Sequence, residues 1–485
     1  MPDDTGTATV RLASVSATPL ATTAICGICL FASLQVATGA DWFGMAATAC
    51  LLALPVFGWR LLRLREKYLL SLAALVAMAV AMTSAGPGKV LETALERGAY
   101  LAGFLTLLSL LRDAATTSDS VLAVGRMLTS QPPGRRYWAI ALGGHAMGVI
   151  MNFGALSLLG PLVQRGARAG GDVDPRIAAI REQRQLSALA RGFSWFIAWS
   201  PTAISQLVAV TVVAGARSAT IALFGAVTAA LVIVAGWLVD RAAGIRARLQ
   251  LPAGQPLQHG PVTPFPWREL GRLFLIYATI IIISAAFAVT LGLPLVTGIM
   301  LAALPVTLLW IFAQIASGRG DGRSFAERAR DLVTRTVPDG SPEAITLALA
   351  GFIGTALAAA LPGSGGGMSD SIVGLPPAVV CIGVVTIVPL ASLVGLPALL
   401  MVTFLGTFLS GALQGLVDPN MLALSLVCGW AVNLTGSPFG GTNLILSRIT
   451  GIPATTLAFR WNAIFSLCAW AVSVAVLSLL SVMPM

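Results

Sequence analysis

Residues 433–443 read Asn-Leu-Thr-Gly-Ser-Pro-Phe-Gly-Gly-Thr-Asn, and they lie inside an otherwise apolar run over residues 420–447. A run of this length is long enough to cross a bilayer. Proline removes a backbone donor from a helix and clashes with the preceding turn, and neighbouring glycines loosen the helix further. We therefore expect a membrane-spanning helix that is interrupted around Pro438, with free backbone carbonyl and amide groups there.

A second interruption of the same kind occurs in the first half of the chain. The apolar segment 191–214 contains Trp-Ser-Pro-Thr-Ala-Ile-Ser at residues 199–205, and its Ser200-Pro201 pair resembles Ser437-Pro438. Interrupted helices in corresponding positions of two halves indicate a transporter site, because unwound carbonyls coordinate cations and half-helix N-termini face anions. The alternative is a packing kink, since Gly and Pro are common in membrane helices.

The composition places the whole chain in the membrane. Of the 485 residues, 56% are hydrophobic and only 10% are charged, whereas about a quarter are charged in soluble domains. We predict an all-α polytopic membrane protein with about 11–14 hydrophobic segments. These segments span roughly residues 21–38, 42–58, 68–84, 97–111, 138–162, 191–214, 218–239, 271–291, 294–314, 343–361, 373–392, 394–416, 420–447 and 460–482.

The basic residues predict the orientation. Lys and Arg outnumber Asp and Glu by 30 to 20, and most of them lie in loops beside apolar segments, which is typical of cytoplasmic loops and not of nucleic-acid binding. The N-terminal tail, residues 1–20, is then also cytoplasmic. Segment 138–162 has basic loops on both sides. We expect it to form a re-entrant hairpin with a turn near Asn152, the alternative being an ordinary helix.

The chain divides into two membrane repeats. The first covers residues 21–240 and contains the hairpin at about 138–162 and the interrupted helix 191–214. A Pro-rich cytoplasmic linker, 241–270, separates it from the second repeat. That repeat, 271–485, is expected to contain a hairpin at about 396–418, with residues 406–411 at its centre, and the interrupted helix 420–447.

Inverted symmetry between the repeats adds a condition. The second hairpin would have to open outward, which requires that one of segments 343–361 and 373–392 is a surface or broken helix. Otherwise the repeats are not inverted. Before the first hairpin, residues 118–131 are expected to form an amphipathic surface helix.

Two short runs carry a family resemblance. Residues 150–161 read Ile-Met-Asn-Phe-Gly-Ala-Leu-Ser-Leu-Leu-Gly-Pro, and residues 436–443 read Gly-Ser-Pro-Phe-Gly-Gly-Thr-Asn. The first run is similar to the first hairpin of arsenite efflux pumps, and the second resembles an unwound helix of the ion transporter superfamily, which also includes divalent-anion/sodium symporters and citrate carriers. The resemblance implies sodium- or substrate-binding roles for Asn152, Gly154, Gly436, Ser437, Pro438, Thr442 and Asn443. It also implies a homodimer.

The candidate substrate- and ion-binding residues are the small and polar residues of the hairpins and interruptions. They are Asn152, Gly154, Ser157, Ser200, Pro201, Thr202, Ser205, Thr407, Ser410, Asn433, Thr435, Gly436, Ser437, Pro438, Gly440, Thr442 and Asn443. His145 is a candidate for proton coupling, because an unperturbed histidine titrates near pH ~6.5; a neutral packed histidine is the alternative. No cofactor and no metal other than Na⁺ is expected.

These features predict a secondary active transporter of a bacterial inner membrane. It would move a small organic or inorganic anion by alternating access, coupled to Na⁺ or H⁺. An efflux pump for a toxic or aromatic solute is the alternative. A membrane enzyme acting on a lipid-linked substrate is less favoured, because the chain has only two histidines and no acidic pair at a membrane face. Expected partners are the solute and the lipid bilayer.

Overall fold

The computed structural model describes residues 19–482, apart from residues 60, 61, 63, 85, 130, 169–173, 251–266, 319–321 and 361–373. All regular structure in this part of the chain is helical, which confirms the all-α prediction. Most of the expected tail 1–20 and the prolines of the expected linker 241–270 lie outside the described residues.

The first half of the chain contains ten α-helices and one 3-10 turn in the described residues. They are α1 (Pro19–Thr38), α2 (Asp41–Phe57), α3 (Leu64–Thr83), α4 (Pro87–Thr116), α5 (Asp119–Thr129), α6 (Pro133–Met151), α7 (Gly154–Arg168), α8 (Pro175–Ser194), η1 (Phe196–Ala198), α9 (Ile204–Val212) and α10 (Ser218–Gln250).

The second half is also helical in the described residues and contains two π-helical turns. Its described elements are α11 (Trp267–Leu291), α12 (Leu295–Ala316), α13 (Phe325–Asp331), η2 (Leu332–Thr336), α14 (Val337–Ala360), α16 (Pro377–Leu393), α17 (Ala398–Ala412), α18 (Pro419–Gly436), α19 (Gly441–Thr450), η3 (Thr456–Trp461) and α20 (Ala463–Leu480).

The lengths and hydropathy of these helices fit a polytopic membrane protein. Among the described residues, nine helices are long and apolar enough to cross a bilayer, and three shorter apolar helices accompany them. The interrupted pair α18 and α19 counts as one span, Pro419–Thr450, and it is the most buried of the nine. A span that is polar at its middle and surrounded by protein is positioned to line a binding site and not to face lipid.

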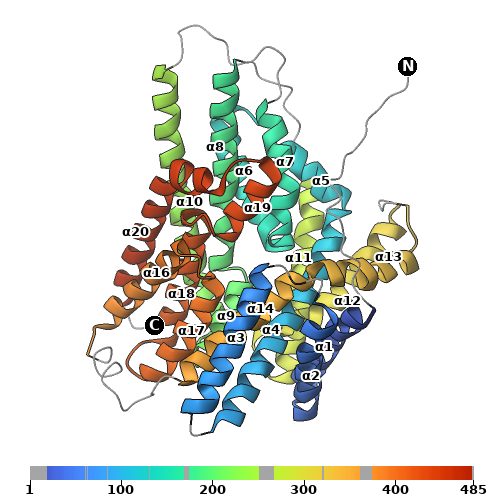
Figure 1. Ribbon diagram of the computed structural model, residues 1–485. Coiled ribbons are helices and arrows are strands. Elements are labelled where there is room, and N and C mark those ends of the chain that lie inside the picture. Colours follow the sequence, from blue (N-terminus) through green and yellow to red (C-terminus); the bar gives the residue numbers. More distant parts are fainter. Residues whose placement is uncertain are drawn as a thin grey trace.

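The helices form two groups along the long axis of the molecule. In Figure 1, α6, α7 and α8 occupy the upper part of the view, and α1, α2, α3 and α14 occupy the lower part. Within the upper group α8 packs against α6 and α7, and α7 packs against α19. In the lower group α14 packs against α4, α3 and α17.

Small residues allow the close helix contacts. A Cβ on Gly192 of α8 would lie 2.0 Å from the carbonyl oxygen of Ala141 in α6, and a Cβ on Gly98 of α4 would lie 2.9 Å from that of Ala348 in α14. Neither position can accept a side chain without separating the backbones. Membrane helices associate largely through such packing, since lipid provides no hydrophobic driving force between them.

A buried arginine connects α8 to neighbouring helices. Arg191 of α8 is 4% exposed, and its guanidinium donates to Asn462 Oδ1 at 2.9 Å, to the Trp461 carbonyl at 3.1 Å and to the Gly236 carbonyl at 3.3 Å. The same group lies over the ring of Phe465, 5.2 Å from its centroid. A buried charge is tolerated when its donors are satisfied in this way, so Arg191 ties α8 to α10 and to the start of α20.

The first expected hairpin is a helix–turn–helix in the structure. Helices α6 and α7 pack against each other and reverse direction at Asn152 and Phe153. Asn152 has φ +52°, and it is the only non-glycine residue with positive φ among the described residues. Its side-chain oxygen accepts a hydrogen bond from the Phe153 amide at 3.0 Å. Its ψ of −137° lies outside the left-handed helical region, so this local bond and the packing of the two helices hold a backbone conformation that side chains rarely adopt.

The second expected hairpin is corrected by the structure. Residues 406–411 do not form a turn, because α17 continues unbroken from Ala398 to Ala412. Gly406 serves helix packing, since a Cβ there would lie 2.3 Å from Cγ2 of Val212. The chain reverses before this helix, around Gly395, which has φ +89°. The inverted relation of the two repeats remains a prediction, since residues 361–373 lie outside the described part.

The amphipathic segment 118–131 contains α5. Its apolar residues Val121, Val124 and Leu128 are buried, and the helix packs against α6, α7 and α11. The helix therefore connects α4 to the hairpin, and its apolar face packs against protein.

Candidate substrate and ion site

The first interruption lies between α8 and α9. The chain leaves the helix after Ser194, forms the turn η1 and re-enters a helix at Ile204. Side chains of the following residues satisfy the freed carbonyls: Ser205 Oγ donates to the Ile197 carbonyl at 2.5 Å, and Gln206 Nε2 donates to the Ala198 carbonyl at 3.0 Å. Buried backbone groups require such partners, and these bonds stabilise the non-helical backbone of the interruption.

Two hydroxyls connect this interruption to the hairpin. Ser200 and Thr202 bring their hydroxyl oxygens within 2.7 Å of each other, and Thr202 donates to the Val149 carbonyl near the end of α6 at 2.7 Å. Pro201 lies between them, so the Ser-Pro-Thr sequence bends the chain toward the hairpin tip. The predicted residues Ser200, Thr202 and Ser205 are thus brought together as the frame of the interruption.

The second interruption runs from Ser437 to Gly440, between α18 and α19. Asn443 bridges it, because its Nδ2 donates to the Thr435 carbonyl at 3.1 Å and to the Ser437 carbonyl at 2.9 Å. Thr435 Oγ1 lies 3.0 Å from the Ser466 hydroxyl in α20. The Ser437 hydroxyl donates to the Ser392 carbonyl at 3.1 Å. The polar residues of this stretch therefore point into protein.

Oxygen atoms converge beside Gly440. A Cβ at this position would lie 2.5 Å from the carbonyl oxygen of Asn433, 2.9 Å from that of Leu434 and 3.0 Å from that of Ser437. The side-chain oxygens Oδ1 of Asn433 and Asn443 are also buried, and neither has a hydrogen-bond partner within the described part of the chain. Carbonyl and amide oxygens are the ligands that hard cations take in proteins, so this donor set fits a small cation such as Na⁺.

The two interruptions meet. Ser194, at the end of α8, has its hydroxyl oxygen 3.1 Å from that of Thr442 in α19. The hairpin tip reaches the same place, because a Cβ on Gly441 would lie 3.0 Å from Cε1 of Phe153. Residues from the hairpin, the first interruption and the second interruption therefore surround one point, the start of α19.

Two helix N-termini adjoin at this point. Helix α7 begins at Gly154, directly after Phe153, and α19 begins at Gly441, against the Phe153 ring. Each N-terminus carries a partial positive charge, which favours an anion, although the Ala155 and Leu156 amides of α7 already donate to the Asn152 and Phe153 carbonyls.

An arginine that sequence reasoning missed lies beside the hairpin tip. The stem of Arg112 crosses Gly154, where a Cβ would lie 2.5 Å from Cγ and Cδ of the arginine. Its guanidinium lies 3.7 Å from the Glu343 carboxylate. Hydropathy alone ends the span at residue 111 and assigns Arg112 to a loop, whereas α4 continues to Thr116. Only the folded hairpin reveals that the stem of Arg112 lies against Gly154.

His145 is held as a neutral, fully bonded ring. Its Nε2 accepts from the Trp199 indole at 2.7 Å, and its Nδ1 lies 2.9 Å from the Gly192 carbonyl. Since a carbonyl accepts only, Nδ1 carries the proton and Nε2 does not. Both ring nitrogens are occupied by structural partners, which fits a packed histidine better than a proton carrier.

Three predicted site residues lie apart from this junction. Ser157 is exposed on α7, and Thr407 is half-buried on α17. The Ser410 hydroxyl accepts a hydrogen bond from the Ala214 amide at 3.0 Å, just after α9. Ser410 therefore stabilises the chain just after the end of α9.

The fold and the interrupted helices define an integral, multi-pass α-helical membrane protein. No protein-family model matches the chain, and no curated protein matches its sequence. Solved structures do match. The fold is similar to that of the YdaH transporter of Alcanivorax borkumensis, whose topology is described as unusual, with TM-score 0.56, 12% identity, and coverage of 86% of this chain and 97% of that one.

A second solved structure with this fold is MtrF of Neisseria gonorrhoeae, described among a class of antimetabolite efflux pumps. Its TM-score is 0.56 at 14% identity, covering 86% of this chain and 94% of MtrF. The chain therefore shares its overall fold with these two transport proteins.

Proposed function

We propose that this protein is a secondary active transporter that moves a small organic or inorganic anion by alternating access, with Na⁺ as the coupling ion. The observation that carries the proposal is the junction at the start of α19. There the Ser194 and Thr442 hydroxyls lie 3.1 Å apart. In the same interrupted helix, the side-chain oxygens of Asn433 and Asn443 have no hydrogen-bond partner among the described residues. Interrupted helices that meet inside a bundle of spans are the usual setting of a carrier's binding site.

Na⁺ is preferred over H⁺ on the chemistry of the donor set. Burying an unpaired amide oxygen costs about 1–3 kcal/mol, and Asn433 and Asn443 each have one. A cation that collects these oxygens with the carbonyls around Gly440 would recover that cost. A proton carrier needs a group that gains and loses a proton, and both nitrogens of His145 are engaged elsewhere.

An anionic solute is preferred because the groups near the hairpin tip are electropositive. The N-termini of α7 and α19 adjoin, and Arg112 crosses the first residue of α7. A carboxylate or oxyanion placed there would accept from backbone amides and from a guanidinium, which are strong charge-assisted bonds.

The wider assignment extends the sequence resemblance. The runs 150–161 and 436–443 resemble the ion transporter superfamily, and the junction brings parts of both runs together. With it we propose residence in a bacterial inner membrane, cytoplasmic basic loops and N-terminus, and a homodimer.

Efflux is the second candidate. It is favoured by the likeness to MtrF, which is described among antimetabolite efflux pumps. The same junction would then bind a drug-like anion on its way out of the cell, and the aromatic ring of Phe153 beside Gly441 would suit an aromatic solute.

Uptake into proteoliposomes tests the proposal. Purified protein would be reconstituted with an inward Na⁺ gradient or a matched K⁺ gradient, and a panel of radiolabelled carboxylates, oxyanions and aromatic acids would be offered. We expect Na⁺-dependent accumulation of at least one anion, lost in Asn443→Ala. Absence of gradient-driven flux for the whole panel would contradict the proposal. Export in inverted cell vesicles would separate efflux from uptake.

A further inference from the structure

A separate cavity lies between α5, α11 and α12, away from the junction. Its volume is about 360 Å³, within the range of ~300–1,000 Å³ typical of small-ligand pockets. One part of its lining is polar and includes Ser118, Asp119, Ser120, Arg272 and Gln314. The remainder is mainly apolar and includes Leu275, Val306 and Leu309.

The residues around the cavity are typical of the level where lipid headgroups meet the hydrocarbon layer. Arg272 follows the start of α11 by five residues, and that helix begins with Trp267, which is 72% exposed. Exposed tryptophan and arginine at a helix end mark the bilayer interface. On the hydrocarbon side, Leu275 is 65% exposed and Leu309 is 52% exposed. The apolar wall therefore continues onto surface that faces lipid.

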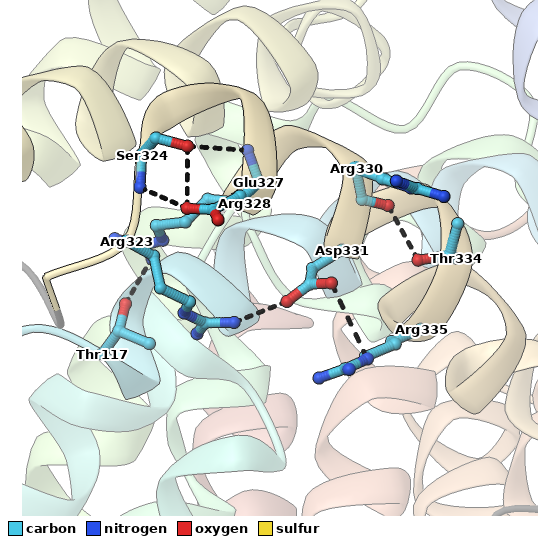
Figure 2. Close-up of polar contacts among 9 residues, drawn as sticks. All are labelled: Thr117, Arg323, Ser324, Glu327, Arg328, Arg330, Asp331, Thr334 and Arg335. Atoms are coloured by element: carbon cyan, nitrogen blue, oxygen red, sulfur yellow. Dashed lines mark hydrogen bonds and ion pairs between the residues drawn. The ribbon is translucent and has the colours of Figure 1, made fainter.

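One lining residue, Gln314, is held by Arg328, and Figure 2 shows the polar contacts around this arginine. Arg328 of α13 donates to Gln314 Oε1 at 2.7 Å and also bonds Thr117. Gln314 Nε2 donates to the Ala114 carbonyl at 2.8 Å. A capping box between Ser324 and Glu327 starts α13 and sets the direction of Arg328. The charge of Arg328 is thus satisfied within the protein and is not offered to a ligand.

Two opposite charges remain at the polar end. In the described part of the chain no ion pair is formed by Arg272 or by Asp119, although both line the cavity. A guanidinium binds phosphate oxygens in a planar, bidentate manner, and a carboxylate binds an ammonium. A ligand that carries both groups beside an apolar tail would pair every charge present.

We propose that this cavity binds the headgroup of phosphatidylethanolamine from the surrounding leaflet. Arg272 holds the phosphate, Asp119 holds the ammonium, and the acyl chains lie along Leu275 and Leu309. A lipid with phosphate as its only charged group would leave Asp119 unpaired beside an anion, and an apolar ligand would leave both charges unpaired. The inference does not depend on which solute the protein carries.

Native mass spectrometry of the purified chain tests the site. The protein would be titrated with phosphatidylethanolamine or phosphatidylglycerol of identical acyl chains. We expect the ethanolamine lipid to bind about tenfold more tightly, the effect of one charge-assisted contact. Arg272→Gln should lose most of this binding, and Asp119→Asn should remove the preference between the lipids. Equal binding of both lipids to the unaltered protein would overturn the proposal.

Two further variants guard against misfolding and misassignment. Arg268→Gln lies one turn earlier on α11, is exposed and does not line the cavity, so it should bind lipid like the unaltered protein. Ala313→Trp fills the cavity from an exposed position and should block binding while the protein stays monodisperse. If Arg268→Gln matched Arg272→Gln, the binding would be surface attraction only. Soluble glycerophosphoethanolamine has the same headgroup without acyl chains and should bind far more weakly than the lipid; binding of equal affinity would point to a soluble ligand and reject the lipid.

Discussion

The hydroxyl oxygens of Ser194 and Thr442 lie 3.1 Å apart, although 248 residues separate them along the chain. Ser194 ends α8 before the first interruption, and Thr442 is the second residue of α19 after the second interruption. Both side chains are almost fully buried. The contact therefore joins the two interrupted helices directly, without an intervening element.

This contact predicts non-additive effects on stability. Removing one hydroxyl leaves the other buried and unpaired, which costs about 1–3 kcal/mol. We expect Ser194→Ala and Thr442→Ala each to lower the thermal unfolding midpoint in detergent, and the double variant to lose less than the sum of the two. Ser157→Ala, on an exposed face of α7, serves as the control. Strict additivity would mean that the hydroxyls do not interact.

The packing around Gly440 predicts that a substitution there weakens the dependence of transport on Na⁺. A Cβ at this position would lie 2.5 Å from the Asn433 carbonyl oxygen, so Gly440→Ala must displace the carbonyls that we propose bind Na⁺. We expect the Na⁺ concentration for half-maximal transport to rise about tenfold or more, the loss of one to two ligand contacts. Gly411→Ala is the matched control, because a Cβ there meets nothing within 4 Å. Equal Na⁺ dependence in the two variants would remove Gly440 from the site.

The position of Arg112 predicts that its substitution weakens binding of the transported anion. Arg112→Gln removes the cation beside the hairpin tip, and we expect the KM for the transported anion to rise about ten- to hundredfold, the usual value of a charged hydrogen bond. Arg112→Lys should recover part of the loss, since the charge stays but the planar fork does not. Arg165→Gln, near the exposed end of α7, should leave KM unchanged. A fall in kcat alone would indicate a structural role for Arg112.

The hydrogen bonds of His145 predict how transport depends on pH. Glutamine can donate to the Gly192 carbonyl and accept from the Trp199 indole, as the neutral ring does, but it cannot titrate near neutral pH. We expect His145→Gln to retain transport with the same dependence on pH between ~5.5 and ~8. If the variant lost a pH-dependent step present in the unaltered protein, coupling to H⁺ through His145 would replace Na⁺ as the mechanism.

Local chemistry explains what could be predicted from the sequence. Pro201 and Pro438, together with the small and polar residues around them, favour an interrupted helix. Proline alone does not decide it, since Pro161, Pro305 and Pro389 lie inside continuous helices. Asn152 likewise indicates a turn, because the asparagine side chain bonds to nearby backbone groups and favours turns. The long apolar runs predict spans because the bilayer imposes their length.

Tertiary packing explains what could not be predicted. Gly406 suggests a turn by composition, but it serves the close contact of α17 with Val212 and leaves the helix unbroken. By hydropathy, Arg112 lies at the end of a span. Its position beside Gly154 depends on how the hairpin packs against α4. Side-chain partners such as Ser392 for Ser437 come from distant helices, and no local pattern encodes them.

The pairing of Ser194 with Thr442 also has a consequence for biosynthesis. At ~5–20 residues per second, a ribosome needs roughly 12–50 s to make the 248 residues between them. During that interval the nascent first half already contains a buried polar break whose partner does not exist. Until α19 is inserted, water, lipid headgroups or a chaperone must cover that surface, and a chain truncated before residue 442 would reach quality control with it still uncovered.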